Sequence, residues 1–151
     1  MDFLWRMAKG EYRGYDISPA VNVVTDQLIN PEYAVPAIEI LGRIPGKENQ
    51  YRLAGIVSEP KNDKLRDPAA MELNRHIHAN GLALDRKQIA DLKTAHKEAP
   101  QESFLRSQLN VTMSLIDRPG LSRTGADLFN FRPDPPAPPP APKEKEEKKD
   151  N

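Results

Sequence analysis

The chain has no cysteine among its 151 residues. This absence excludes disulfide bonds, a thiolate nucleophile and zinc sites with sulfur ligands. An excess of charge of either sign is also missing, because 22 Lys and Arg balance 22 Asp and Glu. The balance is local as well, since residues 1–57, 58–99, 100–132 and 133–151 each lie within one charge of neutrality. A nucleic-acid backbone is held by clustered Lys and Arg, so we expect no nucleic-acid partner.

Long hydrophobic runs are lacking too. No stretch approaches the roughly 18 consecutive apolar residues that cross a bilayer. Residues 1–8 have an apolar face, but they lack the basic region and the long hydrophobic segment of a secretion signal. We therefore expect a cytoplasmic protein with no signal peptide and no transmembrane helix.

The last residues, 133–151, differ in composition from the rest of the chain. Seven of the 15 prolines lie in residues 133–142, and Lys and Glu dominate residues 143–151. Such a segment has too few apolar side chains to offset the entropy of ordering, so we predict a disordered, proline-rich and charged tail. Its Pro-x-x-Pro spacings fit either a ligand for an aromatic-lined groove or a stiff spacer, and the spacer is favoured because proline-dense runs produce this spacing by chance.

The remaining pattern is typical of a mainly α protein with about five short helices. Apolar residues recur at helical spacing between proline, asparagine and glycine stops. The segments delimited in this way are residues 2–10, 18–30, 31–42 and 67–80. Residues 51–57 fit a strand or a helix equally, because periodicity does not decide at this length. Residues 61–66 are expected to form a charged loop.

A helical hairpin is predicted for the C-terminal part of this body. Asp85 and Gln88 have the spacing of a capping box, with Leu84 and Ile89 in the two staple positions. The helix that starts there ends before Pro100, and apolar side chains continue at helical spacing from about residue 101 to 118. Two helices joined by so short a turn lie antiparallel.

Reactive groups are sparse. His76 and His78 are two residues apart on a predicted helix and therefore face different directions. Glu72 precedes His76 by four residues and could share a metal with it or serve a small hydrolase, but a solvated Glu–His pair is favoured. The glycines occur singly, and no serine lies in a Gly-x-Ser-x-Gly motif. We expect no catalytic residue, no metal site and no cofactor.

Aromatic residues gather at the N-terminus, where six of nine lie in the first 51 residues. Prolines break this part of the chain into short elements, so its aromatic residues form either a local core or anchors for another protein. The pattern favours neither interpretation. A membrane-surface contact, with Trp5 and the cations Arg6 and Lys9 at the interface, is a weaker alternative. The candidate partner-binding residues are Phe3, Leu4, Trp5, Tyr12 and Tyr15.

The order of these segments carries a resemblance to a known family. Its parts are the apolar-aromatic opening at residues 3–7 with glycines at 10 and 14, the proline-punctuated stretch to 43–46, the charged loop and helix at 67–79, and the hairpin at 85–118. This order resembles the helical C-terminal region of large multi-domain (polyvalent) phage and mobile-element proteins. The resemblance covers residues 3–118 and brings no catalytic motif. It implies a virion-associated or accessory role.

Together these features predict three regions. Residues 1–60 form an apolar, aromatic docking region, residues 61–132 a charged loop, a short helix and the hairpin, and residues 133–151 the tail. We expect a non-enzymatic structural or adaptor protein that docks on a larger protein assembly through the first region. The alternatives are a peptide-ligand adaptor acting through the proline-rich tail and a small hydrolase using Glu72 and His76. The pattern leaves the oligomeric state open.

Overall fold

The computed structural model describes residues 1–12 and 14–118, so the tail predicted over 133–151 lies outside the described residues. The described part is helical and contains no strand, which confirms a mainly α fold. Its seven α-helices exceed the expected five. They are α1 (Asp2–Ala8), α2 (Val21–Asp26), α3 (Ala34–Leu41), α4 (Lys47–Ser58), α5 (Asp63–Asn80), α6 (Arg86–Glu98) and α7 (Phe104–Ile116). Three 3-10 turns accompany them, η1 (Ser18–Ala20), η2 (Gln27–Ile29) and η3 (Pro60–Asn62).

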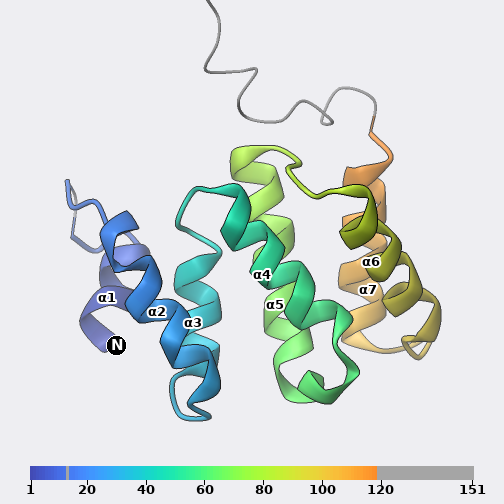
Figure 1. Ribbon diagram of the computed structural model, residues 1–151, viewed down its shortest axis with the longest axis horizontal. Coiled ribbons are helices and arrows are strands. Elements are labelled where there is room, and N and C mark those ends of the chain that lie inside the picture. The colour runs from blue at the N-terminus through green and yellow to red at the C-terminus, as the bar shows by residue number, and fades with distance from the viewer. Residues whose placement is uncertain (13, 119–151) are drawn as a thin grey trace, which may run out of the picture.

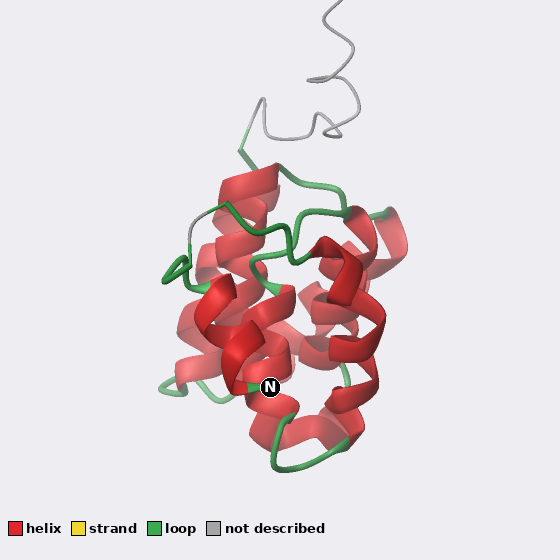
Figure 2. Cartoon of the chain, turned by 90° about the vertical axis from the view of Figure 1, so that its left-hand side faces the viewer, coloured by secondary structure: helices red, strands yellow, loops and turns green. Residues whose placement is uncertain are grey.

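Helix α5 lies at the centre of the molecule and packs against α3, α4 and α7. Helix α6 contacts α4 and α7, so the hairpin of α6 and α7 shares its packing with the preceding helices. In Figure 1, α1, α2 and α3 lie at one end of the long axis and α6 and α7 at the other. Figure 2 looks onto the first end, with the N-terminus in front.

The interior forms where the apolar faces of α3, α4, α5 and α7 meet. The stripes expected from helical spacing are buried, among them Ile38 and Leu41 on α3, Leu73 and Ile77 on α5, and Leu109 on α7. Each fully buried Leu or Ile side chain contributes about 1.5–3 kcal/mol of transfer free energy. Burial of these apolar faces therefore explains why α5 packs against α3, α4 and α7.

Residues 51–57, for which strand and helix were both open, belong to α4. The helix starts directly after Gly46, whose φ of 132° is accessible to glycine. Its buried residues are Asn49, Gln50, Leu53, Ala54 and Val57, which recur at helical spacing. The two polar members of this face lie just before the segment, which is why the short apolar run alone did not show the helical period.

The charged loop expected over residues 61–66 is wrong. Helix α5 begins at Asp63, so Pro68, which was expected to open a helix, lies inside one. Two tertiary contacts order these charged residues: Leu65 packs against the core, and Arg66 Nε donates to the Val57 carbonyl at 2.8 Å. Pro68 lies near the start of a long helix, where the ladder loses a single hydrogen bond.

The predicted hairpin is confirmed. The Asp85 carboxylate accepts a hydrogen bond from the Gln88 backbone at 2.8 Å, and the Gln88 side chain accepts one from the Asp85 backbone at 3.1 Å. The second helix starts later than expected, at Phe104, because Ser103 Oγ caps it by accepting from the Arg106 backbone at 3.1 Å. The Arg106 guanidinium in turn donates to the His96 carbonyl, which ties the end of α6 to α7.

Candidate docking surface

Helix α1 positions the aromatic residues of the N-terminus. Seven residues are too few to form a stable helix alone, and none of them is buried. Leu4 and Trp5 pack, partly buried, against the core, and α1 makes its helix contacts with α3. Gly10, with a φ of 80°, turns the chain out of the helix into the loop that carries Tyr12 and Tyr15. The attachment of α1 to α3 thus decides which aromatic side chains reach solvent.

Trp5 is the centre of that attachment. Its indole Nε1–H donates a hydrogen bond to Glu39 Oε2 on α3. The Lys9 ammonium lies 3.4 Å from the centroid of the Trp5 ring and 3.8 Å from Glu39 Oε2. The ammonium is attracted both by the carboxylate and by the negative face of the ring. Trp5 therefore fixes α1 to α3 within the chain.

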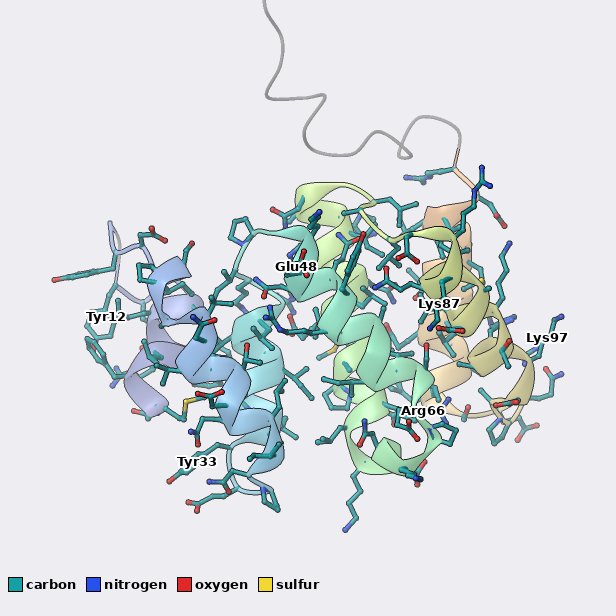
Figure 3. All side chains as sticks on the ribbon, in the orientation of Figure 1. Tyr12, Tyr33, Glu48, Arg66, Lys87 and Lys97 are labelled. Carbon is teal, nitrogen blue, oxygen red and sulfur yellow. The ribbon has the colours of Figure 1, made fainter. Side chains whose placement is uncertain are left out.

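Phe3, Tyr12 and Tyr15 face solvent, and we call these three residues the aromatic surface. Their exposed fractions are 58%, 36% and 68%. The ring centroids of Phe3 and Tyr12 lie 5.2 Å apart with an interplanar angle of 47°, within the range of favourable aromatic pairs. In Figure 3, Tyr12 lies at the N-terminal end of the molecule, beside α1 and away from α4 and α5.

The cations beside the aromatic surface have intramolecular partners. The Arg6 guanidinium lies 5.6 Å from the centroid of the Tyr12 ring, and its Nε donates to Glu11 Oε2 at 2.7 Å. The hydrogen bond and the charge of Glu11 raise the pKa of Arg6. Lys9 is likewise placed beside the Glu39 carboxylate. Because both cations of the membrane interpretation are paired with carboxylates, this geometry suits a protein partner better than an anionic lipid surface.

The five predicted partner-binding residues are therefore divided into two groups. Leu4 and Trp5 contact the chain's own core, whereas Phe3, Tyr12 and Tyr15 lie at the surface. Sequence reasoning treated them as one set. Glu39, the partner of Trp5, is 34 positions away in the sequence. No pattern of neighbouring residues therefore indicated that the Trp5 side chain faces the interior.

Glu72 and His76, the alternative catalytic pair, lie in the interior. Each is 1% exposed, so the solvated pair expected from the sequence is wrong. Glu72 Oε2 lies 3.4 Å from Arg43 Nη1 and 3.1 Å from Arg75 Nε. Burial raises the pKa of Glu72, and the two guanidinium groups oppose this rise. The carboxylate is packed over Gly42, where an added Cβ would lie 2.6 Å from the Glu72 Cβ.

Both ring nitrogens of His76 have hydrogen-bond partners. Nε2 lies 3.1 Å from the Ile44 carbonyl, which can only accept, so Nε2 carries the proton. Nδ1 then accepts from Gln50 Nε2 at 3.1 Å. This neutral tautomer agrees with a pKa of His76 that burial lowers. Gln50 also donates to the Gly81 carbonyl and accepts from the Ala83 backbone, each at 2.8 Å, so the group joins α4, α5 and the following loop.

A signal for this buried group is present in the sequence, although no motif marks it. His76 follows Leu73 by three residues and precedes Ile77, so it lies on the apolar face of the helix. A polar residue on such a face is usually a satisfied structural group. The contacts of Glu72 and His76 fit that role, because their polar atoms are used to hold helices together.

Two other kinds of site are absent from residues 1–12 and 14–118. No three His, Asp or Glu side chains in this part come together as a metal ion would require. No helix here has the length and apolar character needed to span a membrane. Comparisons with family models, curated proteins and solved structures found no match to this chain.

Proposed function

We propose that this protein is a non-enzymatic structural or adaptor protein that docks on a larger protein assembly through the aromatic surface. One observation carries the proposal: Leu4 and Trp5 hold α1 against the core while Phe3, Tyr12 and Tyr15 remain at the surface. Burying apolar area contributes about 25 cal/mol per Å². Aromatic side chains of this kind are frequent centres of binding energy in protein interfaces.

The arrangement of the rings supports the proposal further. The contact between Phe3 and Tyr12 and the position of Arg6 over Tyr12 limit the freedom of these side chains before binding. Binding then orders fewer degrees of freedom, which favours affinity. The ion pair of Arg6 with Glu11 places charge beside the aromatic residues, as at the rim of many interfaces.

The resemblance in element order suggests which assembly to test first. The similar region belongs to large phage and mobile-element proteins that include virion components. Phage virions and their accessory complexes are therefore the first class of partner in this proposal. A protein interface that buries the aromatic surface is the common requirement, whatever the assembly.

Site-specific photo-crosslinking tests the docking surface directly. A benzophenone amino acid replaces Tyr12 in one variant and Ile29, which is 90% exposed, in a matched control. We expect a cross-linked product of one defined mass from position 12 in an extract of the encoding organism or virion, and none from position 29. Excess unmodified protein should suppress it, and the combination Phe3→Ala with Tyr15→Ala should reduce it. Equal products at both positions, or none at position 12, would refute the proposal.

The same experiment separates the two alternatives. A chain that ends at Arg132 should retain the product if the aromatic surface is the docking site, whereas its loss would favour an adaptor acting through the proline-rich tail. For the hydrolase alternative, Glu72→Gln should leave cross-linking from position 12 unchanged. Turnover of an ester or phosphoester substrate that disappears in Glu72→Gln would argue for catalysis instead.

A further inference from the structure

A groove between α4 and α6 lies apart from the aromatic surface. Two adjoining cavities of about 310 and 170 Å³ share Gly55, Ser58 and Asp91, so they form one continuous depression. It runs from Tyr51 and Gln88 at its upper end to Glu98 at its lower end. Figure 1 shows α4 and α6 side by side and running in the same direction, and Figure 3 labels Lys87 near the start of α6.

The groove owes its depth to small residues on its floor. Gly55 lies inside α4, and no heavy atom comes within 4 Å of a Cβ placed on it. Ala95 lines the opposite side. A glycine inside a helix lowers its stability relative to alanine, and no close packing among the residues that the structure describes requires one here. The position leaves room for atoms of another molecule to approach the backbone of α4.

Two carboxylates without an ion-pair partner among the described residues lie at the lower end of the groove. Lys87 Nζ pairs with Asp91 at 3.1 Å, so the upper end is neutral. Within the described part of the chain, neither Glu59 nor Glu98 lies within ion-pair distance of a cation. Both side chains are exposed and both line the groove. Charge complementarity therefore favours a cationic occupant at this end.

A second observation, at the junction of the two cavities, also indicates a ligand. The Ser58 Oγ is buried and has no hydrogen-bond partner among the residues that the structure describes. A buried hydroxyl without a partner is unfavourable, and such groups are uncommon in native proteins. Ser58 lines both cavities, so its hydroxyl can turn to meet a donor placed in the groove.

We propose that this groove binds an arginine side chain on an extended segment of a partner protein. The aliphatic stem lies over Gly55 and Ala95, and the guanidinium reaches the carboxylates of Glu59 and Glu98 and the hydroxyl of Ser58. The five N–H donors of a guanidinium suit several acceptors arranged around one end of a cleft. The cavity volume lies at the lower end of the range for ligand sites, which fits one long side chain and not a folded element.

The test uses the full chain and two pentapeptides. The probe is acetyl-Ala-Ala-Arg-Ala-Ala-amide, and the control replaces arginine by citrulline, which has the same shape without the charge. We expect saturable amide chemical-shift changes centred on Gly55, Ser58 and Thr94, with citrulline binding at least about fivefold weaker. Equal binding of the two peptides, or shift changes spread over the whole surface, would overturn the proposal.

Variants of the groove sharpen the result. Glu59→Gln combined with Glu98→Gln should weaken binding about three- to tenfold, since each exposed charge pair contributes a factor of a few. Glu32→Gln combined with Glu48→Gln, exposed acids outside the groove, should leave it unchanged. Gly55→Leu should abolish it by filling the floor, provided its circular dichroism shows a folded chain. An unchanged affinity in the Glu59 and Glu98 double variant would refute the site even if Gly55→Leu does not fold.

One rival occupant is the chain itself, because Arg123 and Arg132 lie beyond the described residues. If a chain ending at Arg118 shows altered Gly55 and Ser58 amides without peptide, and binds the peptide more tightly, its own C-terminal segment fills the groove. That outcome would overturn the partner proposal. Identical spectra at these amides and identical affinity would support it. Phe3→Ala and Tyr15→Ala should not affect the peptide in either case, which separates this site from the aromatic surface.

Discussion

The first 33 residues and the helices from α3 to α7 keep their structure by different means. Among the described residues up to 33, Val24 is the one that is buried, and α1, η1 and η2 have no buried residue. Each helix from α3 to α7 buries at least two residues, and α5 buries seven. The N-terminal region is thus attached to an interior that the later helices form among themselves.

Polar interactions differ between the two regions in the same way. The N-terminal region is attached by the partly buried contact of Trp5 with Glu39, beside Lys9. In the interior, Asn74 accepts from Thr112 at 2.7 Å in a buried contact, and Gln50 and His76 form another. Buried polar groups are costly to disrupt because water does not replace the lost partner. Changes in the interior should therefore alter global stability, and changes near the N-terminus mainly local order and binding.

The largest expected effect compares one side chain from each region. Leu73→Ala removes a fully buried side chain of α5 and should lower the free energy of unfolding by about 2–5 kcal/mol. Phe3→Ala removes an exposed ring and should change it by no more than about 0.5 kcal/mol. Urea unfolding followed by circular dichroism measures both. Comparable losses would show that the N-terminal region belongs to the cooperative interior and is not merely attached to it.

The same substitution at two glycines should have opposite effects. A Cβ on Gly42 would lie 2.6 Å from the Glu72 Cβ, so Gly42→Ala forces a shift in the interior. We expect it to lower the free energy of unfolding by about 1–3 kcal/mol. Gly55→Ala meets no atom within 4 Å and should stabilise the protein by about 0.5–1 kcal/mol. Thermal unfolding of both variants gives the comparison. A neutral Gly42→Ala would mean that Glu72 is not held tightly over α3.

Within the helices from α3 to α7, the sequence predicted some elements better than others. Local signals located the hairpin well, because the capping box of Asp85 and Gln88 depends on residues three apart. The first turns of α5 were missed because their order depends on Leu65 and Arg66, which contact other elements. Helix propensity and stops are local, whereas these contacts come from the folded chain.

The candidate site shows the same limit. The sequence singled out the aromatic residues near the N-terminus as a group, because their density there is visible without a structure. It did not separate Trp5 from Phe3, since that depends on Glu39 of another helix. It also did not show that Glu72 is buried beside Arg43, which reaches it from the turn after α3. Each of these errors concerns a contact between residues that are far apart in the sequence.

The pH dependence of stability tests the polar interior. Burial lowers the pKa of His76, so the unfolded chain, with a histidine pKa of about 6.5, binds the proton more readily. The stability contributed by neutral His76 is complete above about pH 6.5 and is lost as the pH falls below it, at up to about 1.4 kcal/mol per pH unit.

His76→Asn should therefore flatten the decrease in the urea midpoint between pH 7 and 5, whereas His78→Asn, at an exposed position, should retain the parent profile. The raised pKa of Glu72 acts in the opposite direction, with stability falling as the pH rises. Comparing each variant with its parent at the same pH isolates the part due to His76. A decrease as steep in His76→Asn as in the parent would assign the acid sensitivity to other groups.

The smallest effect concerns the attachment of the N-terminal region. Trp5→Phe retains a ring but removes the N–H that donates to Glu39. It should lower the free energy that holds α1 against α3 by about 0.5–1.5 kcal/mol. Hydrogen exchange should become faster for the amides of α1 and stay unchanged for those of α5, since α1 contributes no buried residue. Tyr15→Phe, at an exposed position, should change neither. Faster exchange in α5 as well would show that the attachment also supports the interior. Trp5 holds α1, and α1 in turn places Phe3 against Tyr12. Trp5→Phe should therefore also weaken cross-linking from position 12, although the Trp5 indole faces the chain's own interior.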